Sequence, residues 1–297
     1  MRMKLAAAAL MACLLSGSAW AQHALVLQSD FGTLDGAVAA MKGVAVGVSP
    51  DIRIYDLTHD IPVFNIWEAG LRLVQVAEYW PPGTVFVSVV DPGVGTDRKS
   101  IVLKTSSGHY FVTPDNGTLT FVAPRLGIAE VREIDEAVNR RKNSEKNYTF
   151  HGRDVYSYTG ARLAAGIISF EQVGPRLPDQ VVLIPYEKAR FEDGVVYGNI
   201  QTHDGTFGNI WTNVGRDTFQ MLQLQYGDKA RVSIFRRGEP FLELVVPYFP
   251  TFGLAGLGEP LLYLNSLDSV SLAVNQGSFA DRYRVESGPD WSIQIRR

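Results

Sequence analysis

The sequence predicts an α/β domain with a mainly parallel sheet, followed by a mostly β domain. In the first half, short apolar runs alternate with segments of helical periodicity, as in parallel α/β sheets. The apolar run at residues 84–90 is continuous and β-branched, which is typical of a strand buried on both faces. Beyond Gly174, short β-like runs are separated by Gly, Asp and Pro turns, with few helical stretches.

The first half contains alternating strand and helix candidates. In chain order we expect a strand at 23–28, a helix at 36–48 preceded by the capping residue Asp35, a strand at 52–57, a helix at 65–79 that ends before Pro81-Pro82-Gly83, and the strand at 84–90. We therefore assign the N-terminal α/β domain to residues 22–186.

The second half contains β-like runs divided by turns. They lie at residues 194–201, 221–224, 230–234 and 241–246. We assign the second domain to residues 187–297. With 46% hydrophobic residues over 297 positions, the chain has enough apolar side chains for two cores.

The N-terminus has the features of a secretory signal peptide. Arg2 and Lys4 precede a short apolar run, and a small-x-small cleavage pattern ends at Ala21. We expect residues 1–21 to be removed after Ala21, which predicts a periplasmic or secreted protein. The alternatives are a buried first helix and a lipoprotein at Cys13, although the apolar run continues past Cys13, where a lipobox would end it.

Charge and cysteine content restrict the partners that the mature chain can have. Cys13 is the only cysteine, so the chain from Gln22 onward has none and forms no disulfide. Loss of Arg2 and Lys4 changes the formal net charge from −3 to −5, which gives no electrostatic reason to expect nucleic acid or a membrane as partner. The expected ligand is a small molecule.

Polar, glycine-rich loops follow the predicted strands, and in α/β sheets such loops carry the ligand site. They lie at residues 29–36, 91–98 and 113–118. Asp30 follows a strand directly, so it either binds a ribose diol or serves as a turn or cap residue. Asp35 has the same two interpretations.

Asp91 and Arg98 lie seven residues apart in a loop that has neither a P-loop ending nor a complete dinucleotide fingerprint. Their pairing either closes the loop as an ordinary salt bridge or holds an ionised carboxylate for chemistry. His151, in a polar, glycine-containing break, is either a structural or a catalytic histidine.

Zinc and serine-hydrolase chemistry are not indicated. None of the five histidines has zinc-ligand spacing, so we expect no catalytic metal. No serine lies in a G-x-S-x-G elbow. Residues 204–213 form a loop rich in amide groups, which either binds the zwitterionic end of an amino acid or is a hairpin with Asn and Gly turn chemistry.

Seven segments together resemble one known family. They are Asp30-Phe-Gly-Thr-Leu-Asp35, Asp56-Leu-Thr-His59, Asp91-Pro-Gly-Val-Gly-Thr96, Pro114-Asp-Asn-Gly117, Thr149-Phe-His-Gly-Arg-Asp154, Phe207-Gly-Asn-Ile-Trp-Thr-Asn213 and Tyr263-Leu-Asn-Ser266. In order and spacing they resemble the S-adenosyl-L-methionine (SAM) hydroxide adenosyltransferases, which are related to the SAM-dependent halogenases. The resemblance covers about residues 24 to 280.

The resemblance implies both an architecture and an activity. The C-terminal domain should be barrel-like, and the protein should form a homotrimer with each substrate between the N-terminal domain of one subunit and the C-terminal domain of the next. The implied reaction is hydrolysis of SAM to adenosine and L-methionine by attack of an activated water on the ribose C5′. SAM is the substrate, and no cofactor is expected.

The resemblance also assigns the candidate site residues. Those that match the water-activating set are Asp91, Arg98 and His151. Those expected to contact the substrate are Asp30, at the ribose, together with Asp35, Phe64, Phe150, Gly152, Asp204, Asn209, Trp211, Tyr263 and Ser266. Asp204 and Asn209 match residues that hold the methionine part.

The chemistry of the substrate agrees with this assignment. The leaving group of a sulfonium departs as a neutral thioether, so the difficulty lies in making water nucleophilic and aligned. We expect Asp91 mainly to orient water and to share a developing proton with His151.

Two other functions are compatible with the resemblance. A halogenase would need a halide beside Asp91, where the fluorinating relatives have tyrosine, and they have serine at Gly152; an acidic side chain repels a halide. The other alternative is a non-catalytic periplasmic protein that binds an adenosyl ligand. Leu267 and Val274 replace arginines of the halogenases, so backbone amides are expected to neutralise the substrate carboxylate. Export would separate the enzyme from cytoplasmic SAM, so either SAM reaches the periplasm or the substrate is another adenosyl compound.

Overall fold

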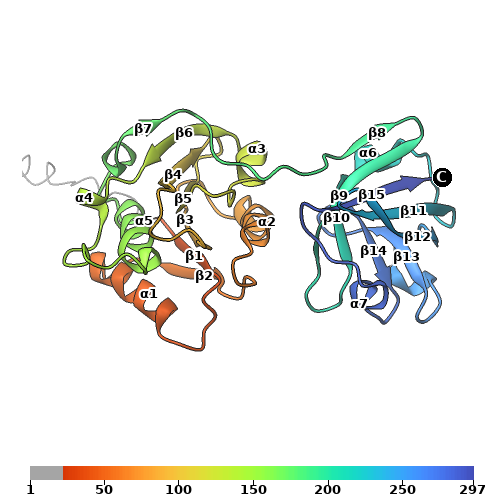
Figure 1. Cartoon of the computed structure of the whole chain (residues 1–297), viewed down its shortest axis with the longest axis horizontal. Coiled ribbons are helices and arrows are strands. Elements are labelled where there is room, and N and C mark those ends of the chain that lie inside the picture. The colour runs from red at the N-terminus through yellow and green to blue at the C-terminus, as the bar shows by residue number, and fades with distance from the viewer. Residues whose placement is uncertain (1–22) are drawn as a thin grey trace, which may run out of the picture. The chain divides into compact units, whose positions relative to one another are not determined.

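A computed structural model describes residues 23–297, and the predicted signal peptide lies outside these residues. The chain divides into two compact units, the first ending at Val181 and the second beginning at Val182. Figure 1 shows that the first unit combines helices with a sheet and that the second consists mainly of strands. Within residues 23–297, no helix combines the length and apolarity needed to cross a membrane.

The first unit alternates strands and helices through most of its length. Its elements are β1 (Leu25–Ser29), α1 (Ala37–Val48), β2 (Ile54–Thr58), α2 (Ile66–Ala77), β3 (Val85–Val89), β4 (Ser100–Thr105), β5 (Tyr110–Pro114), α3 (Val122–Leu126), β6 (Ile128–Glu133), α4 (Glu136–Asn139), the π-helix η1 (Gly152–Ser157), α5 (Tyr158–Ala164), the 3₁₀-helix η2 (Phe170–Val173) and β7 (Arg176–Leu177).

These strands form one mixed sheet in the order β2-β1-β3-β5-β4-β6-β7. The β2-β1-β3-β5 part is parallel, whereas β4, β6 and β7 pair in antiparallel fashion. Because β1, β2 and β3 run in the same direction, the loops after Ser29, Thr58 and Val89 leave the sheet at one edge. This edge carries the polar loops that the sequence indicates.

Helices cover both faces of the sheet. Leu27 and Val87 contribute to a core with α1 and α5, while Val26 and Phe86 contribute to a second core with α2 and α3 on the other face (Figure 1). Fully burying such a side chain contributes about 1.5–3 kcal/mol. At Gly160 in α5, a methyl group would lie 2.4 Å from Val87 Cγ2, so the helix packs closely on the sheet only because this residue is glycine.

The second unit is almost entirely β. Its elements are β8 (Arg190–Glu192), β9 (Val195–His203), β10 (Ile210–Gly215), α6 (Arg216–Gln220), β11 (Lys229–Arg236), β12 (Glu239–Pro247), the 3₁₀-helix η3 (Phe252–Leu254), β13 (Pro260–Leu264), β14 (Ser269–Val274), α7 (Phe279–Tyr283) and β15 (Trp291–Arg296).

The strands of the second unit form an antiparallel sheet in the order β12-β11-β15-β9-β10-β14-β13, and β8 pairs with β9. A bridge between Tyr248 and Leu262 brings the two ends of this order together, so the sheet is nearly a barrel. Along β11, Ala230, Val232 and Ile234 alternate into the enclosed core, as the two-residue period of a strand requires. The predicted fold class is confirmed in both units.

One predicted strand is wrong. Residues 221–224 follow α6 as a turn and an irregular segment, although Leu222 and Leu224 are buried in the core of the second unit. Their apolar character reflects packing against the core and not strand pairing. The strands β13, β14 and β15 were not predicted from the sequence.

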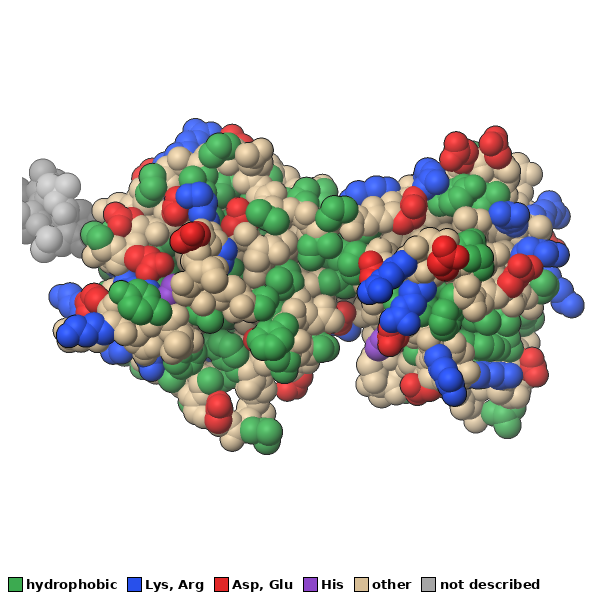
Figure 2. All heavy atoms as spheres, viewed as in Figure 1, with side chains coloured by type: hydrophobic (Ala, Val, Ile, Leu, Met, Phe, Trp, Pro, Cys, Tyr) green, Lys and Arg blue, Asp and Glu red, His purple; other side chains and the backbone are tan. Residues whose placement is uncertain are grey.

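Surface charge contributes little to holding the second unit together. On the face in view, Lys and Arg side chains of this unit lie beside Asp and Glu side chains (Figure 2). Several form exposed ion pairs, such as Arg231 with Glu243 and Arg236 with Glu286. Exposed pairs of this kind contribute about 0–1 kcal/mol each, so the apolar core is the main source of stability.

Candidate active site

A cavity of about 260 Å³ lies at the carboxyl ends of β1 and β3 in the first unit. The residues that line it are Asp30, Phe31, Val63, Phe64, Val89, Asp91, Val94, Thr149, Phe150, His151 and Gly152. Six of the predicted site residues are therefore in one cavity: Asp30, Phe64, Asp91, Phe150, His151 and Gly152. Arg98 is not among the lining residues, but it contacts Asp91 and His151.

Arg98 holds the Asp91 carboxylate from one side. Its Nε lies 2.9 Å and 3.0 Å from the two carboxylate oxygens of Asp91, and its Nη2 lies 2.5 Å from Oδ2. Both side chains are nearly buried, with exposed fractions of 12% for Arg98 and 5% for Asp91. The predicted pairing of these residues is confirmed, and it fixes the carboxylate with acceptor capacity left on Oδ1.

His151 lies between two guanidinium groups. Its Nδ1 is 3.0 Å from Arg98 Nη2, and its Nε2 is 3.1 Å from Arg140 Nη2. Glu136 in turn accepts hydrogen bonds from Arg140 Nε and Nη2 at 2.9 and 2.5 Å. The catalytic candidates therefore extend into a five-residue hydrogen-bonded cluster.

This environment disfavours the charged imidazolium. Burial lowers the pKa of His151, and the charges of Arg98 and Arg140 lower it further against the opposing effect of Glu136 and Asp91. Because a guanidinium only donates and a neutral imidazole accepts at one nitrogen, only one of the two arginine contacts is a satisfied hydrogen bond. Asp91 is thus better placed than His151 to accept a hydrogen bond from a water in the cavity.

Arg98 remains charged in this setting. Burial alone would lower the pKa of Arg98, but its hydrogen bond to Asp91 and the nearby acidic groups raise the pKa above its ordinary value. Its Nη1 also donates to Ser100 Oγ at 3.1 Å. The guanidinium therefore acts as a fixed positive charge beside Asp91.

Tyr156 completes the buried side of the cluster. Its hydroxyl lies 3.1 Å from Ser100 Oγ and 3.5 Å from Asp91 Oδ2. Burial, together with the Asp91 charge, raises the pKa of Tyr156 well above its ordinary value, so the hydroxyl stays protonated. Tyr156 is carried by η1, a π-helix that starts directly after His151, and short π-helical segments are frequent at functional sites.

Asp30 and Phe64 are joined by a hydrogen bond. The backbone N–H of Phe64 donates to Asp30 Oδ2 at 2.9 Å, and Phe64 has a φ of 65°, in the left-handed region that a non-glycine residue rarely adopts. Asp35 lies outside the cavity, where its carboxylate accepts from Ala37 N–H at the start of α1. The N-cap position of α1 itself is Gly36, and the substrate contact that the resemblance implies for Asp35 stays a prediction.

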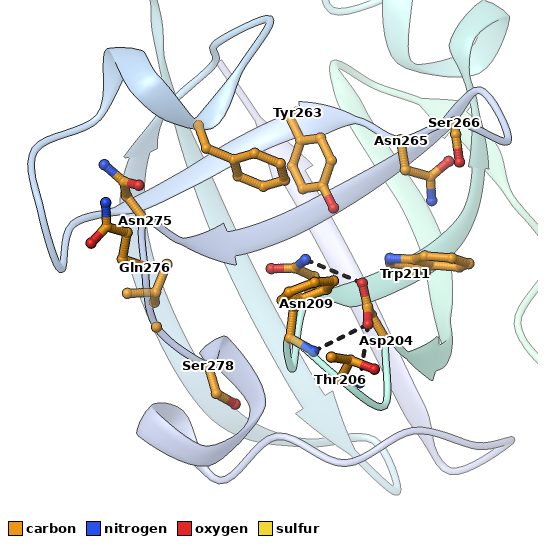
Figure 3. Close-up of a pocket in the computed structure, with 14 residues that line it drawn as sticks. Asp204, Thr206, Asn209, Trp211, Tyr263, Asn265, Ser266, Asn275, Gln276 and Ser278 are labelled. Atoms are coloured by element: carbon orange, nitrogen blue, oxygen red, sulfur yellow. Dashed lines mark hydrogen bonds between the residues drawn. The ribbon is translucent and has the colours of Figure 1, made fainter.

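The second unit contains a larger cavity of about 810 Å³. It brings together all five predicted residues of this unit, Asp204, Asn209, Trp211, Tyr263 and Ser266. Other lining residues, none of which was a predicted site residue, are Thr206, Phe207, Phe252, Asn265, Asn275, Gln276, Gly277 and Ser278. Figure 3 shows the carboxylate of Asp204, the hydroxyl of Tyr263 and the indole nitrogen of Trp211 pointing toward the same space.

Asp204 is the only charged side chain among the residues that line this second cavity. One carboxylate oxygen accepts from the backbone N–H groups of Thr206 and Phe207 at 3.2 and 3.1 Å, and the other lies 3.5 Å from Asn209 Nδ2. Among the described residues, the buried Nε1 of Trp211 has no hydrogen-bond acceptor. The cavity therefore offers one anion and several neutral donors, which suits a cationic or zwitterionic ligand better than an anionic one.

The cavities can be assessed for metal binding from their side chains. Within residues 23–297, no group of three or more His, Cys, Asp or Glu side chains is arranged to hold a metal ion. Sequence reasoning missed Arg140, Glu136 and Tyr156 in the first unit, because none of them lies in a motif that carries the family resemblance.

Each unit matches one domain of the same protein family. Residues 25–174 match the model of the SAM hydroxide adenosyltransferase N-terminal domain, and residues 198–292 match the model of its C-terminal domain. The chain is 42% identical to an (R)-S-adenosyl-L-methionine hydrolase of Methanocaldococcus jannaschii, over 65% of this chain and 67% of the relative. It is 28% identical to a fluorinase of Actinopolyspora mzabensis, over 92% and 97% of the two chains.

A solved structure of an uncharacterized conserved protein from Thermotoga maritima has the same fold. It aligns with a TM-score of 0.82 and 36% sequence identity, and the alignment covers 92% of this chain and 100% of that chain.

Proposed function

This chain belongs to the SAM hydroxide adenosyltransferase family, and we propose that it hydrolyses SAM to adenosine and L-methionine with water as the nucleophile at the ribose C5′. The observation that carries the proposal is the cluster of Asp91, Arg98 and His151 at the wall of a cavity that Asp30 and Phe64 also line. Curated relatives named (R)-SAM hydrolase support the same activity.

In the proposed reaction, Asp91 holds and orients the water. The water oxygen forms a bond to C5′ as the bond from C5′ to sulfur breaks, and methionine leaves as a neutral thioether. The water loses one proton, so the products are adenosine, methionine and a proton. Asp91 accepts that proton first and passes it to solvent, while Arg98 fixes the carboxylate and neutral His151 fixes Arg98.

The leaving group departs without charge, so this reaction needs no acid and no metal. We assign ribose binding to Asp30, whose carboxylate can accept from the diol. Phe64, Phe150 and Gly152 form the wall beside the substrate.

The second cavity supplies the methionine-binding part of the proposal. We assign the α-ammonium group to Asp204 with Asn209, and the α-carboxylate to the unpartnered indole N–H of Trp211 and to backbone amides. Val274 lines this cavity without charge and Leu267 is not among its lining residues, so neutral donors must replace the arginines that halogenases carry. Tyr263 and Ser266 complete the wall near methionine or adenine.

Two features favour water over halide. The carboxylate of Asp91 lines the cavity and repels an anion. At Gly152, a methyl group would lie 3.1 Å from Val89 Cγ1 and 3.2 Å from the ring of Phe31, so a halide-binding serine has no room without movement of these neighbours. The fluorinase activity of some relatives is therefore not proposed for this chain.

We further propose a homotrimer in which each complete site takes the first cavity from one subunit and the second cavity from the next. Support comes from the distribution of candidate groups, since the first unit carries the water-activating set and the second unit carries Asp204, the candidate for binding the ammonium group. Co-expression of Asp91→Asn and Asp204→Asn subunits tests this: about one quarter of the sites in random trimers would regain both intact halves. A site contained within one subunit predicts no recovery.

We also propose that the protein is exported from the cytoplasm. The Arg2 and Lys4 positions, the apolar run and the cleavage pattern at Ala21 support a mature protein that begins at Gln22 outside the cytoplasm. Mass spectrometry of the protein from a periplasmic extract should find an N-terminus at Gln22. A chain that keeps its first residues and stays in the cytoplasmic fraction would refute export.

Product analysis tests the catalytic proposal. Purified protein incubated with SAM should release adenosine and methionine in equal amounts, and added chloride or fluoride should leave both yields unchanged. A 5′-halo-adenosine product would indicate the halogenase. Bound and unchanged SAM would indicate a binding protein without turnover.

A further inference from the structure

A chain of hydrogen bonds connects β1, β2 and α1 next to the first cavity. Lys42 Nζ donates to Asp56 Oδ2 at 2.6 Å, Asp56 Oδ1 lies 3.1 Å from His59 Nε2, and His59 Nδ1 lies 2.7 Å from Ser29 Oγ. The motif Asp56-Leu-Thr-His59 is one of the segments that mark the family resemblance, yet none of its residues lines the cavity. Any effect of this motif on the cavity therefore has to act through other residues.

The direction of each hydrogen bond follows from its neighbours. Asp56 only accepts when ionised, and its hydrogen bonds from Lys42 and His59 outweigh the effect of burial and lower the pKa of this carboxyl. In the neutral imidazole of His59, the proton on Nε2 matches the Asp56 acceptor, and Nδ1 is then the acceptor for the Ser29 hydroxyl. The Ser29 oxygen in turn accepts from the backbone N–H of Phe31 at 3.3 Å. With this tautomer, each hydrogen bond of the network has one donor and one acceptor.

This order of residues resembles a Ser-His-Asp triad, but its serine cannot be a nucleophile. Ser29 has an exposed fraction of 0% and His59 of 4%. Ser29 lies inside β1, and none of the cavities described above is lined by it. A triad serine must reach a substrate carbonyl, and this hydroxyl is enclosed by the sheet.

The hydrogen-bond network ends next to residues that line the first cavity. Ser29 directly precedes Asp30 and Phe31, and the carbonyl of His59 accepts from Gly32 N–H at 2.8 Å. His59 thus holds the segment from Ser29 to Gly32 by its side chain and by its backbone. Within this segment Asp30 binds the N–H of Phe64, and the Phe31 ring packs edge-on against Phe150 with centroids 5.7 Å apart.

We propose that His59 is a positioning residue that sets Asp30 and Phe31 for recognition of the ribose, acting through Ser29 and the backbone of Gly32. This inference rests on the proposed function, in which Asp30 binds the ribose diol. Its consequence is that loss of His59 weakens the binding of an adenosyl ligand beyond what the accompanying loss of stability explains.

The chain offers a matched control in the same sheet. His109 is also 4% exposed, its Nδ1 lies 2.9 Å from Ser107 Oγ, and its Nε2 lies 2.9 Å from the carbonyl of Trp80. It precedes β5, whereas the cavity lies at the carboxyl ends of the parallel strands. His59→Gln and His109→Gln therefore break similar buried networks, and only the first one adjoins the cavity.

The experiment compares adenosine binding by calorimetry in wild type, His59→Gln, His109→Gln and Ser29→Ala, with urea unfolding of each. We expect His59→Gln to raise the Kd of adenosine and the KM of SAM about ten-fold, with a smaller change in kcat. His109→Gln should leave these constants within about two-fold of wild type while losing similar stability. Ser29→Ala removes only one hydroxyl and should also raise the Kd of adenosine. It tests the same network if His59→Gln does not fold.

Several results would overturn the inference. Equal adenosine Kd values for His59→Gln and His109→Gln, or an unchanged Kd in a folded Ser29→Ala, would make the network merely structural. A wild-type protein that binds adenosine but does not hydrolyse SAM would refute the proposed activity and leave this comparison valid. A wild-type protein that neither binds adenosine nor hydrolyses SAM would refute both.

Discussion

Replacement of Asp91 by asparagine is the perturbation that separates its chemical role from its structural one. Asparagine keeps the side-chain volume but removes the charge, and its amide nitrogen would face the Arg98 guanidinium. The three close contacts from Arg98 at 2.5–3.0 Å would be reduced to those that one amide oxygen can accept. The attacking water of the proposed reaction would lose the Asp91 carboxylate, its hydrogen-bond acceptor beside His151.

The expected magnitudes follow from this geometry. Removing a positioned proton acceptor lowers kcat by about 10²- to 10⁴-fold. Removing one partner of a buried ion pair costs about 3–5 kcal/mol, and we expect the lower end because Arg98 keeps its contact to Ser100. Adenosine release followed by chromatography measures the first quantity, and urea unfolding measures the second.

Glu130→Gln is the matched control for Asp91→Asn. Glu130 pairs with Arg132 at 2.6 Å, their exposed fractions are 21% and 15%, and neither residue lines the cavity. This variant should lose some stability and keep its kcat. If folded Asp91→Asn turned SAM over within a few-fold of wild type, the role given to this carboxylate would be wrong.

Three further changes test other parts of the site. Burial and the two flanking arginines lower the pKa of His151, so Arg140→Met should raise this pKa. Because the neutral imidazole is the active form, the acid limb of kcat/KM should move to higher pH. A limb that moves to lower pH would contradict this role of Arg140. Gly152→Ser should cost about 1–3 kcal/mol in thermal unfolding through overpacking and should form no 5′-chloro product at high chloride; appearance of that product would show that Asp91 does not exclude halide. Asp204→Asn should raise the KM of SAM about 10- to 100-fold with little change in kcat, and an unchanged KM would remove Asp204 from the ammonium site.

The fold was predictable where local pattern determines it. The continuous apolar run of β3 and the alternation of strands and helices predict the parallel part of the first sheet. The antiparallel additions β4, β6 and β7 were not predicted, because strand direction depends on pairing between distant segments. The same reason explains residues 221–224, whose leucines pack into the core without joining a ladder.

The site was predictable only in part from residue chemistry. Asp91 and Arg98 are seven residues apart and their pairing follows from the loop, whereas His151 lies 53 residues beyond Arg98 and joins them only through the fold. The family motifs supplied that connection. Tyr156 and Arg140 have no motif, and their contacts to Asp91 and His151 depend on how η1 and the segment after α4 pack.

Hydrolysis of SAM in oxygen-18 water tests the central claim most directly. If water attacks C5′, mass spectrometry should find the label in the 5′-hydroxyl of adenosine and none in methionine, and Asp91→Asn should form labelled adenosine about 10²- to 10⁴-fold more slowly. Unlabelled adenosine, label in methionine, or recovery of unchanged SAM would contradict the account.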